Sequence, residues 1–430
     1  MKFKTTILSL LLTLCVGVGV AQNVVTLTPQ QVNDRVSGYI SGGDYGALSR
    51  ELPALREAVV PHLLLLADAL VAYYEGSHAE SNAFIDQLAQ YEKELGGAVI
   101  VSMNNIAYYN ALALEQYAEA GEYLKLVAQR GDEAQQQTST SYQQWMEAMA
   151  KRKRVKIKPS KRDREFAIES RNVGDGSHLM VEAKVGKQSV DMIFDTGCCF
   201  ANCITEEAAQ RLGVKVVLEE LPINGVAGSN RVKVGVLPKM KIGDVVVKNA
   251  SFFIMDKIVD SPAAGKIEAA LGTHVLRALG EMVLDVDKGE VTLPAVKSQA
   301  PETRNLSYHT GNYGIELGFN RRLMVAHLDS GANRSHLSTR FYNEHRTMLN
   351  SIAATRRKIK RSGVGGSEEI EVLSAPGIGL NVGDKLIIFN PMDVYLRGGA
   401  SSWYGVMGVD FLQSAGKVTL DLERMFLRIE

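Results

Sequence analysis

The stretches IFDTG at residues 193–197 and HLDSG at residues 327–331 stand 134 positions apart, each at the end of an apolar run. Their surroundings agree in one order, at offsets between 134 and 140. The further matched pairs are Gly186-Lys187 with Asn320-Arg321, residues 203–205 with 337–339, 225–229 with 363–367, 241–244 with 381–384, 270–272 with 406–408, and 284–285 with 420–421. So many features in one order indicate two copies of one unit.

The repeated triplets place one aspartate in each copy, Asp195 and Asp329. Two carboxylates held face to face cannot both ionise cheaply, so they share a proton. The ionised carboxylate can then take a proton from water while the protonated one polarises a carbonyl group. These aspartates are the predicted catalytic residues. The predicted dyad-supporting residues are Thr196, Gly197, Ser330 and Gly331, whose hydroxyls can fix the pair and whose glycines permit close backbone approach.

This part of the sequence resembles the retropepsin-like aspartic proteases, the superfamily that includes the two-lobed pepsin-like enzymes. The resemblance covers about residues 165–430 and rests on both triplets and on the apolar-apolar-glycine sites that end at Gly272 and Gly408. It implies that two glycine-rich hairpins act as substrate-binding flaps, with Gly225, Gly228, Gly363 and Gly366. It also implies a complete site in one chain, hence catalysis by a monomer.

The first copy departs from the family pattern. Cys198-Cys199 follows its triplet where alanine and a small or polar residue are usual. Thr273-His274 follows Gly272 where the second copy has the more typical Val409-Asp410, and neither flap carries the tyrosine of pepsin-like enzymes. These changes bear on efficiency and specificity more than on the type of reaction.

The chain before the duplicated unit reads as helical. Apolar residues recur at helical spacing from residue 28 to about 149, with glycine breaks at 42–43, 76, 96–97 and 121. Residues 79–84 echo residues 118–123 at an offset of 39, which weakly resembles tetratricopeptide hairpins; an irregular bundle is the alternative. The predicted fold class is therefore an all-α helical domain followed by a duplicated all-β unit of the aspartic-protease type.

Charge and composition divide the chain further. Residues 23–150 hold 16 acidic and 6 basic residues, whereas residues 151–164 hold 9 basic and one acidic, although the whole chain is neutral. We interpret residues 151–164 as a basic linker, solvated or lying against the acidic helical domain. A protease-sensitive hinge that releases the helical part as a pro-segment is a sharper alternative. The predicted domains are the helical domain (22–150), the linker, lobe 1 (165–298) and lobe 2 (299–430).

The first 21 residues have the pattern of a secretory signal peptide: two lysines, an apolar run from residue 7 to 20, and small residues before Gln22. We expect an exported protein, periplasmic or secreted, with no membrane span. Lipoprotein processing at Cys15 is the minor alternative, because Leu14 stands where a small residue is usual. Zero net charge gives no whole-chain argument for a nucleic-acid partner.

Three cysteines remain after the signal: Cys198, Cys199 and Cys203. Their spacing does not supply a second ligand group for zinc, so no metal site is predicted. Burial of at least Cys198 is one interpretation, and a disulfide between Cys199 and Cys203 is the other.

The predicted function is hydrolysis of peptide or protein substrates by an exported aspartic endopeptidase that requires no metal or organic cofactor. The helical domain could bind a protein partner. The alternative is a catalytically inactive peptide-binding or scaffold protein with the same fold.

Overall fold

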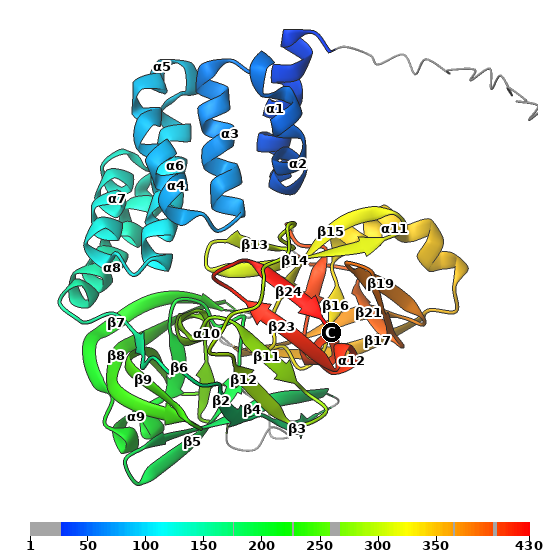
Figure 1. Ribbon diagram of the computed structural model, residues 1–430. Helices are drawn as coiled ribbons and strands as arrows, with labels where there is room; N and C mark the ends of the chain where they lie inside the picture. Colours follow the sequence, from blue (N-terminus) through cyan, green and yellow to red (C-terminus); the bar gives the residue numbers. More distant parts are fainter. Residues whose placement is uncertain (1–26, 175, 226–227, 259–266, 364–365, 399–401) are drawn as a thin grey trace, which may run out of the picture.

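The computed structural model describes residues 27–174, 176–225, 228–258, 267–363, 366–398 and 402–430 (Figure 1). The proposed signal peptide and Cys15 lie outside the described residues. The helices of residues 29–150 gather in one domain, and the strands lie in two lobes beneath it in the view of Figure 1. This arrangement confirms the predicted all-α domain followed by a duplicated all-β unit. Among the described residues, no helix has both the length and the apolar character needed to cross a bilayer.

The helical domain forms because apolar residues recur on one side of successive short helices. Its apolar interior includes Leu70, Tyr108 and Leu124, which are almost completely buried. The helices are α1 (Pro29–Gly42), α2 (Tyr45–Leu55), α3 (Pro61–Tyr74), α4 (His78–Leu88), α5 (Glu92–Leu95), α6 (Gly97–Ala113), α7 (Tyr117–Arg130) and α8 (Glu133–Ala150).

Three of the predicted glycine breaks end helices, whereas the fourth does not. Gly43, Gly76 and Gly96 adopt positive φ angles at the ends of α1, α3 and α5. The predicted break at Gly121 is wrong, because this residue is buried inside α7. A Cβ at Gly121 would lie 3.6 Å from the Cβ of Met146 in α8, so the glycine serves the close packing of two helices rather than a turn.

The two echoing segments occupy equivalent places. Each lies at the start of the second helix of a contacting pair joined by a short turn, α3 with α4 and α6 with α7. The residue before each second helix has nearly the same backbone, with φ −79° and ψ 58° at Ser77 and φ −89° and ψ 62° at Gln116. These features support a helical-hairpin repeat, which stays a prediction.

The basic segment 151–164 is attached to the first lobe. Strand β1 (Lys156–Ile157) pairs antiparallel with β9 (Val245–Met255), and Asn249 Nδ2 donates to the Arg154 carbonyl at 3.1 Å. Its lysine and arginine side chains are exposed except that of Arg164, which is half-buried. In the part of the chain that the structure describes, no ion pair joins residues 151–162 to the helical domain. The backbone is therefore anchored while its charges face solvent.

The first lobe is built on one mixed sheet, ordered β1-β9-β6-β10-β5-β4-β8-β7 with β3 beside β4 over the described residues. Its alternating apolar residues, such as those of β5, bury one face in the core. The elements not yet given are β3 (Glu169–Val173), β4 (Gly176–Val185), β5 (Gln188–Phe194), β6 (Asn202–Thr205), α9 (Glu206–Leu212), β7 (Lys215–Gly225), β8 (Gly228–Ile242), β10 (Ala269–Leu271) and α10 (Thr273–Leu279).

The second lobe repeats this plan. Its sheet follows the order β17-β18-β21-β16-β22-β15-β14-β19-β20, with β13 beside β14, in the described ranges. The elements are β13 (Leu306–His309), β14 (Asn312–Phe319), β15 (Arg322–Leu328), β16 (His336–Leu337), α11 (Thr339–Ser351), β17 (Thr355–Gly363), β18 (Gly366–Ala375), β19 (Ile378–Val382), β20 (Lys385–Phe389), β21 (Met392–Tyr395), β22 (Gly405–Met407) and α12 (Val409–Ala415).

A separate sheet joins the lobes, in the order β2-β12-β11-β23-β24. At its centre β11 of lobe 1 pairs antiparallel with β23 of lobe 2, with Leu284 opposite Val418. These strands contain the matched Leu-Asp pairs of the two copies. The strands are β2 (Arg164–Ala167), β11 (Met282–Asp285), β12 (Glu290–Leu293), β23 (Lys417–Asp421) and β24 (Phe426–Ile429).

The helical domain shares an apolar core with the first lobe. Trp145 of α8 lies against Phe253 of β9, with ring centroids 5.6 Å apart, and both belong to one buried cluster with Leu221 of β7. The domain also reaches the second lobe, where the Tyr73 hydroxyl accepts a hydrogen bond from the Thr310 N–H at 2.5 Å. The helices are thus packed into the same body as the lobes.

Candidate active site

The two predicted catalytic aspartates follow equivalent strands, β5 and β15. Beside each runs a parallel strand, with Phe194 opposite Leu271 and Leu328 opposite Met407. The Asp195 N–H donates to the Leu271 carbonyl at 3.0 Å, and the Asp329 N–H donates to the Met407 carbonyl at 2.9 Å. Each aspartate thus occupies the same position at the end of its strand, and the two meet at the boundary of the lobes.

Each aspartate faces the other copy's triplet. A Cβ at Gly197 would lie 2.3 Å from Asp329 Oδ1, and a Cβ at Gly331 would lie 2.3 Å from Asp195 Oδ1. Distances under 3.0 Å leave no room for a side chain. Glycine is therefore required at both positions for the carboxylates to meet.

Backbone donors hold the carboxylates in place. Asp195 Oδ1 accepts from the N–H groups of Gly197 at 2.8 Å and Cys198 at 3.0 Å. Asp329 Oδ1 accepts from those of Gly331 at 3.0 Å and Ala332 at 3.1 Å. The two halves use the same pair of positions, so the site is close to two-fold symmetric.

The site favours one proton on the pair. Burial, and next the nearby charge of Asp329, raises the pKa of Asp195 to about 7 against its ordinary 3.8, although two backbone hydrogen bonds oppose the shift. Like charges at this separation cannot both be present at low cost. Asp195 therefore keeps a proton at acidic and near-neutral pH, which suits a general acid.

Below the carboxylates, the hydroxyls of Thr196 and Ser330 cross between the lobes. Thr196 Oγ1 donates to the Leu328 carbonyl at 2.7 Å and accepts from the Ser330 N–H at 2.9 Å. Ser330 Oγ donates to the Phe194 carbonyl at 2.7 Å and accepts from the Thr196 N–H at 3.0 Å. Both side chains are almost fully buried. Four hydrogen bonds thus cross between the lobes: two reach the last carbonyl of the other lobe's strand, and two join the triplets to each other.

The second motif glycines lie under the triplet loops. Gly272 N–H donates to Asn202 Oδ1 and Gly408 N–H donates to Ser335 Oγ, both at 2.9 Å. A Cβ at Gly272 would lie 2.1 Å from the Ala201 carbonyl oxygen. Sequence reasoning identified the glycines but missed Asn202 and Ser335, although each is a polar residue six or seven positions after the predicted catalytic aspartate of its copy.

The predicted flap glycines end two long hairpins. Gly225 of β7 lies opposite Gly228 of β8, and Gly363 of β17 lies opposite Gly366 of β18. The hairpin tips, residues 226–227 and 364–365, lie outside the described residues. The structure thus places the four glycines at equivalent hairpin ends.

The alternative interpretation, a disulfide between Cys199 and Cys203, is wrong, since all three cysteines are free; Cys198 is half-buried and Cys203 is buried. It is Cys198 whose Sγ lies 3.0 Å from that of Cys203, while Cys198 Sγ also donates to the Ala201 carbonyl at 3.3 Å. The hydrogen bond to Cys203, and next burial, raises the pKa of Cys198 well above its ordinary value. Burial is the main cause that raises the pKa of Cys199 to about 12.

The packing of Phe200 beside the first triplet was not predicted from sequence. Phe200 adopts a left-handed backbone, φ +67°, and its ring stacks on Tyr109 of α6 at 5.9 Å between centroids. On its other side it fits against Gly311, where a Cβ would lie 2.2 Å from the ring. The helical domain therefore supports the loop that follows Asp195. Sequence gave no signal for this contact between distant segments.

His327, which precedes Asp329 by two residues, is part of an aromatic layer. Its ring stacks on Trp403 with centroids 5.8 Å apart, and burial lowers its pKa. This placement favours a packing role over a catalytic one.

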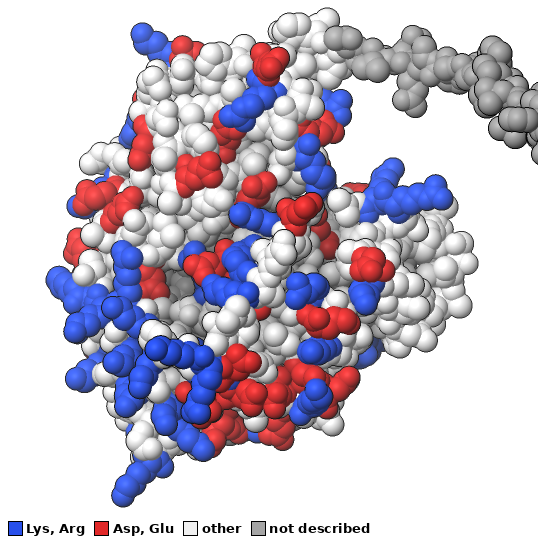
Figure 2. Space-filling view, viewed as in Figure 1, with Lys and Arg blue, Asp and Glu red and all other residues white. Residues whose placement is uncertain are grey.

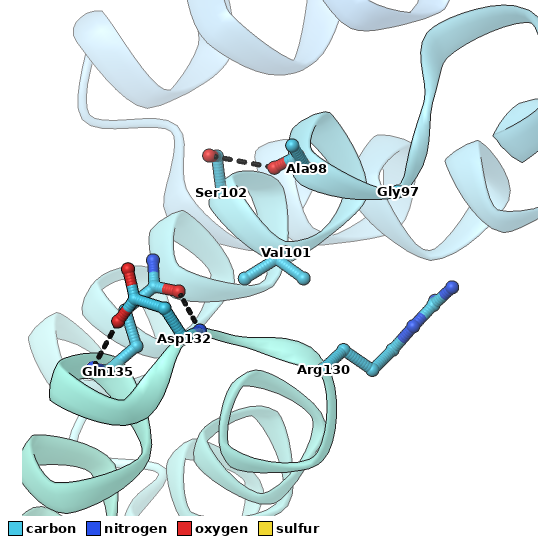
Figure 3. A pocket seen from close by; sticks show the side chains of 7 residues that line it. All are labelled: Gly97, Ala98, Val101, Ser102, Arg130, Asp132 and Gln135. Carbon is cyan, nitrogen blue, oxygen red and sulfur yellow. Dashed lines mark hydrogen bonds between the residues drawn. The ribbon is translucent and has the colours of Figure 1, made fainter.

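A separate hollow of about 510 Å³ lies in the helical domain, between α6 and the turn from α7 to α8 (Figure 3). Its polar groups already bond locally: Asp132 and Gln135 cap α8 reciprocally at 2.9 Å, and Ser102 donates to the Ala98 carbonyl. The hollow lies away from the aspartates and contributes nothing to their site.

Comparison with known protein families finds a match within the first lobe. Residues 181–275 match the aspartyl protease family. Similar solved structures include a retropepsin-like aspartic protease from Rickettsia conorii (20% identity, 30% of this chain and 98% of that one, TM-score 0.21). Basic 7S globulin from soybean (9% identity, 62% and 94%, TM-score 0.36) and conglutin gamma from lupine seeds (12% identity, 63% and 94%, TM-score 0.37) are also similar. A search of curated proteins gave no match.

The family match confirms the resemblance inferred from the repeated triplets: over residues 181–275, this chain carries the sequence pattern of the aspartyl proteases.

Proposed function

We propose that this protein is an aspartic endopeptidase whose dyad consists of Asp195 and Asp329. The observation that carries the proposal is the reciprocal placement of each carboxylate against the other triplet's glycine, above the crossed hydrogen bonds of Thr196 and Ser330. A proton shared between the two carboxyl groups is sufficient to let them lie this close.

In the proposed reaction, Asp329 accepts a proton from a water molecule between the carboxylates. The water oxygen bonds to the carbon of a peptide carbonyl, whose oxygen receives the proton of Asp195. The resulting tetrahedral intermediate breaks its C–N bond as the amine nitrogen takes the proton now on Asp329 and one hydroxyl group of the intermediate returns a proton to Asp195. The dyad is thereby returned with one proton, and the products are a carboxylic acid and an amine.

The helical domain belongs to this unit under the proposal. It shares a buried core with lobe 1 and supports Phe200 beside the first triplet. Removing it as a pro-segment would expose that core, which costs about 25 cal/mol for each Å² of apolar surface. We therefore favour a permanent domain that borders the substrate cleft and could also bind a protein partner.

Export and a monomeric state complete the proposal. The apolar N-terminal pattern supports delivery across a membrane, to the periplasm or the medium. Both aspartates lie in one chain, which supports catalysis by a monomer. Fractionation of the native host with N-terminal sequencing would test the first point, and light scattering of the active protein would test the second.

The function is tested by incubating a mixed peptide library with the wild type, Asp195→Asn and Asp329→Asn from about pH 4 to about pH 8. We expect cleavage by the wild type and a loss of at least about 1000-fold in each variant, because neither can share a proton as the pair does. Folded wild-type protein that cleaves nothing, yet binds peptides, would indicate the inactive binding protein instead.

A further inference from the structure

The outer face of the first lobe carries lysines in register on neighbouring strands. Lys156 of β1 lies directly opposite Lys248 of β9, and Lys248 lies opposite Lys239 of β8 on its other side. Residues directly opposite in antiparallel strands point to the same face, with Cβ atoms about 5 Å apart. One row of this surface therefore consists of three lysines, and all three are exposed.

The next row continues the pattern. The Lys158 N–H donates to the Val246 carbonyl at 3.0 Å, Val246 lies opposite Lys241, and Lys241 lies opposite Lys184 of β4. These positions are two residues along their strands from the first row, so they share its face. We call the six exposed lysines of the two rows the lysine face: Lys156, Lys158, Lys184, Lys239, Lys241 and Lys248.

The charges of the lysine face are largely left without partners of opposite sign. Lys184 pairs with Glu182 at 2.9 Å, whereas no ion pair joins the other five lysines to any residue that the structure describes. Like charges directly opposite in a sheet are destabilising. Packing does not require them either, because the same strands bury the alternate residues Met240 and Val247 on the inner side. These lysines destabilise the sheet and are not needed for its packing, which points to an anionic partner.

Protection of a sheet edge explains only part of this array. Lysines on an edge strand hinder the pairing of sheets between molecules. This accounts for Lys156 and Lys158, because β1 is an edge strand, but β8 and β9 have neighbours on both sides. Lys239, Lys241 and Lys248 therefore need another explanation.

The basic segment 151–162 extends the array. It enters β1 directly, and its other cations are exposed: Lys151, Arg152, Lys153, Arg154, Lys161 and Arg162. Figure 2 shows Lys and Arg gathered on the lower left of the molecule, over the region of β8 and β9 in Figure 1, with Asp and Glu gathered on the neighbouring area. Positive charge is thus concentrated on one side of a chain whose net charge is zero.

We propose that the lysine face, together with segment 151–162, binds the anionic surface of a phospholipid membrane without inserting into it. Lysine ammonium groups are compact, strongly hydrated charges that suit diffuse attraction to such a surface, and polybasic clusters of four to eight residues are typical of it. The two rows form a broad strand surface rather than a protruding helix that could enter a nucleic-acid groove. They also contain no aromatic residue on which a base could stack.

The test uses sedimentation of the mature full-length protein with vesicles of phosphatidylglycerol and phosphatidylcholine, compared with vesicles of phosphatidylcholine alone. We expect binding only to the anionic vesicles and a steep loss as salt rises. The triple variant Lys156→Gln/Lys239→Gln/Lys248→Gln should bind on the order of 100-fold more weakly. Replacing the same three lysines by arginine should preserve binding.

The matched control is Lys288→Gln/Lys385→Gln/Lys417→Gln, which makes the same change in net charge at exposed positions outside the lysine face. It should bind within about twofold of the wild type, since only nearby charges act within a Debye length. Equal losses in both triple variants would overturn the proposal, as would equal binding to both kinds of vesicle. Binding of an oligonucleotide without binding of vesicles would overturn it in favour of a polynucleotide. Near-ultraviolet circular dichroism confirms that each variant is folded, and none of these outcomes depends on peptidase activity.

Discussion

Gly197 of the first triplet lies against the carboxylate of Asp329 in the second, so closely that a Cβ would stand 2.3 Å from Oδ1 and 2.5 Å from Cγ. Gly331 has the same relationship to Asp195. Each glycine thus sets how near the opposite aspartate can come. The separation of the two carboxylates is thus determined by residues that take no part in the proposed proton transfer.

Gly197→Ala should therefore abolish peptidase activity while leaving a folded protein. The added methyl group must push Asp329 away, and overpacking of this kind costs about 1–3 kcal/mol of stability. Activity and urea unfolding check both effects. Gly38→Ala is the control, because nothing lies within 4 Å of that Cβ in helix α1, and it should raise stability by about 0.5–1 kcal/mol without changing activity. Full activity in Gly197→Ala would contradict the close approach.

The stability of the protein should fall as pH rises from about 4 to about 7. The pKa of Asp195 is about 7 in the folded protein, above its ordinary value of 3.8, so the folded state binds more protons than the unfolded state in this interval. The contribution is fully present below the unfolded pKa and is lost as pH rises through the folded one. We expect a loss on the order of 2 kcal/mol, discounted from the full shift because the carboxyl group is partly open to solvent.

Asp195→Asn isolates this effect. The variant cannot ionise at this position, so its stability should match that of the wild type near pH 4 and exceed it near pH 8. Urea unfolding at both pH values gives the comparison. A stability difference that does not change with pH would show that Asp195 is not the group responsible.

Thr196→Val should destabilise the protein by about 2–4 kcal/mol. The variant keeps the shape of the side chain but leaves the Leu328 carbonyl and the Ser330 N–H without their buried partner. Thr196→Ser keeps the hydroxyl and should lose less than about 1.5 kcal/mol. Equal losses in the two variants, measured by urea unfolding, would mean that the crossed hydrogen bonds contribute little.

Mild oxidation should link Cys198 to Cys203. Their Sγ atoms are 3.0 Å apart and both thiols are free. With diamide as the oxidant, two thiols lose two protons and two electrons and form one disulfide. Peptide mapping of the non-reduced protein should find this pair, and Cys203→Ser should prevent it. A bridge that includes Cys199 would contradict the arrangement of the loop.

The duplication made the lobes and the triplets predictable, because an offset of 134 residues carries Asp195 onto Asp329 and Thr196 onto Ser330. The hydrogen bonds that cross between the triplets followed from residue type alone. The features that were not predicted depend on which helices and loops pack against each other in the folded protein. Gly121 looked like a turn because nothing local indicates that Met146 packs against it.

The contacts of the helical domain could not be predicted either, because local sequence does not indicate which distant segments pack together. Phe200 stacks on Tyr109 although 91 residues separate them, and neither lies in a motif. Likewise, a charge run predicted a basic linker, but only the strand register shows that Lys156 adds to a row already formed by Lys248 and Lys239.

The crossed hydrogen bonds of Thr196 and Ser330 also bear on how a duplicated gene can change over time. After duplication, most positions of the two copies are free to diverge, as Cys198 and Ala332 have done. The hydroxyl positions are not, because each bonds to a carbonyl group supplied by the other copy. At these positions each half of the chain is the selective environment of the other half, so the two can be replaced only together.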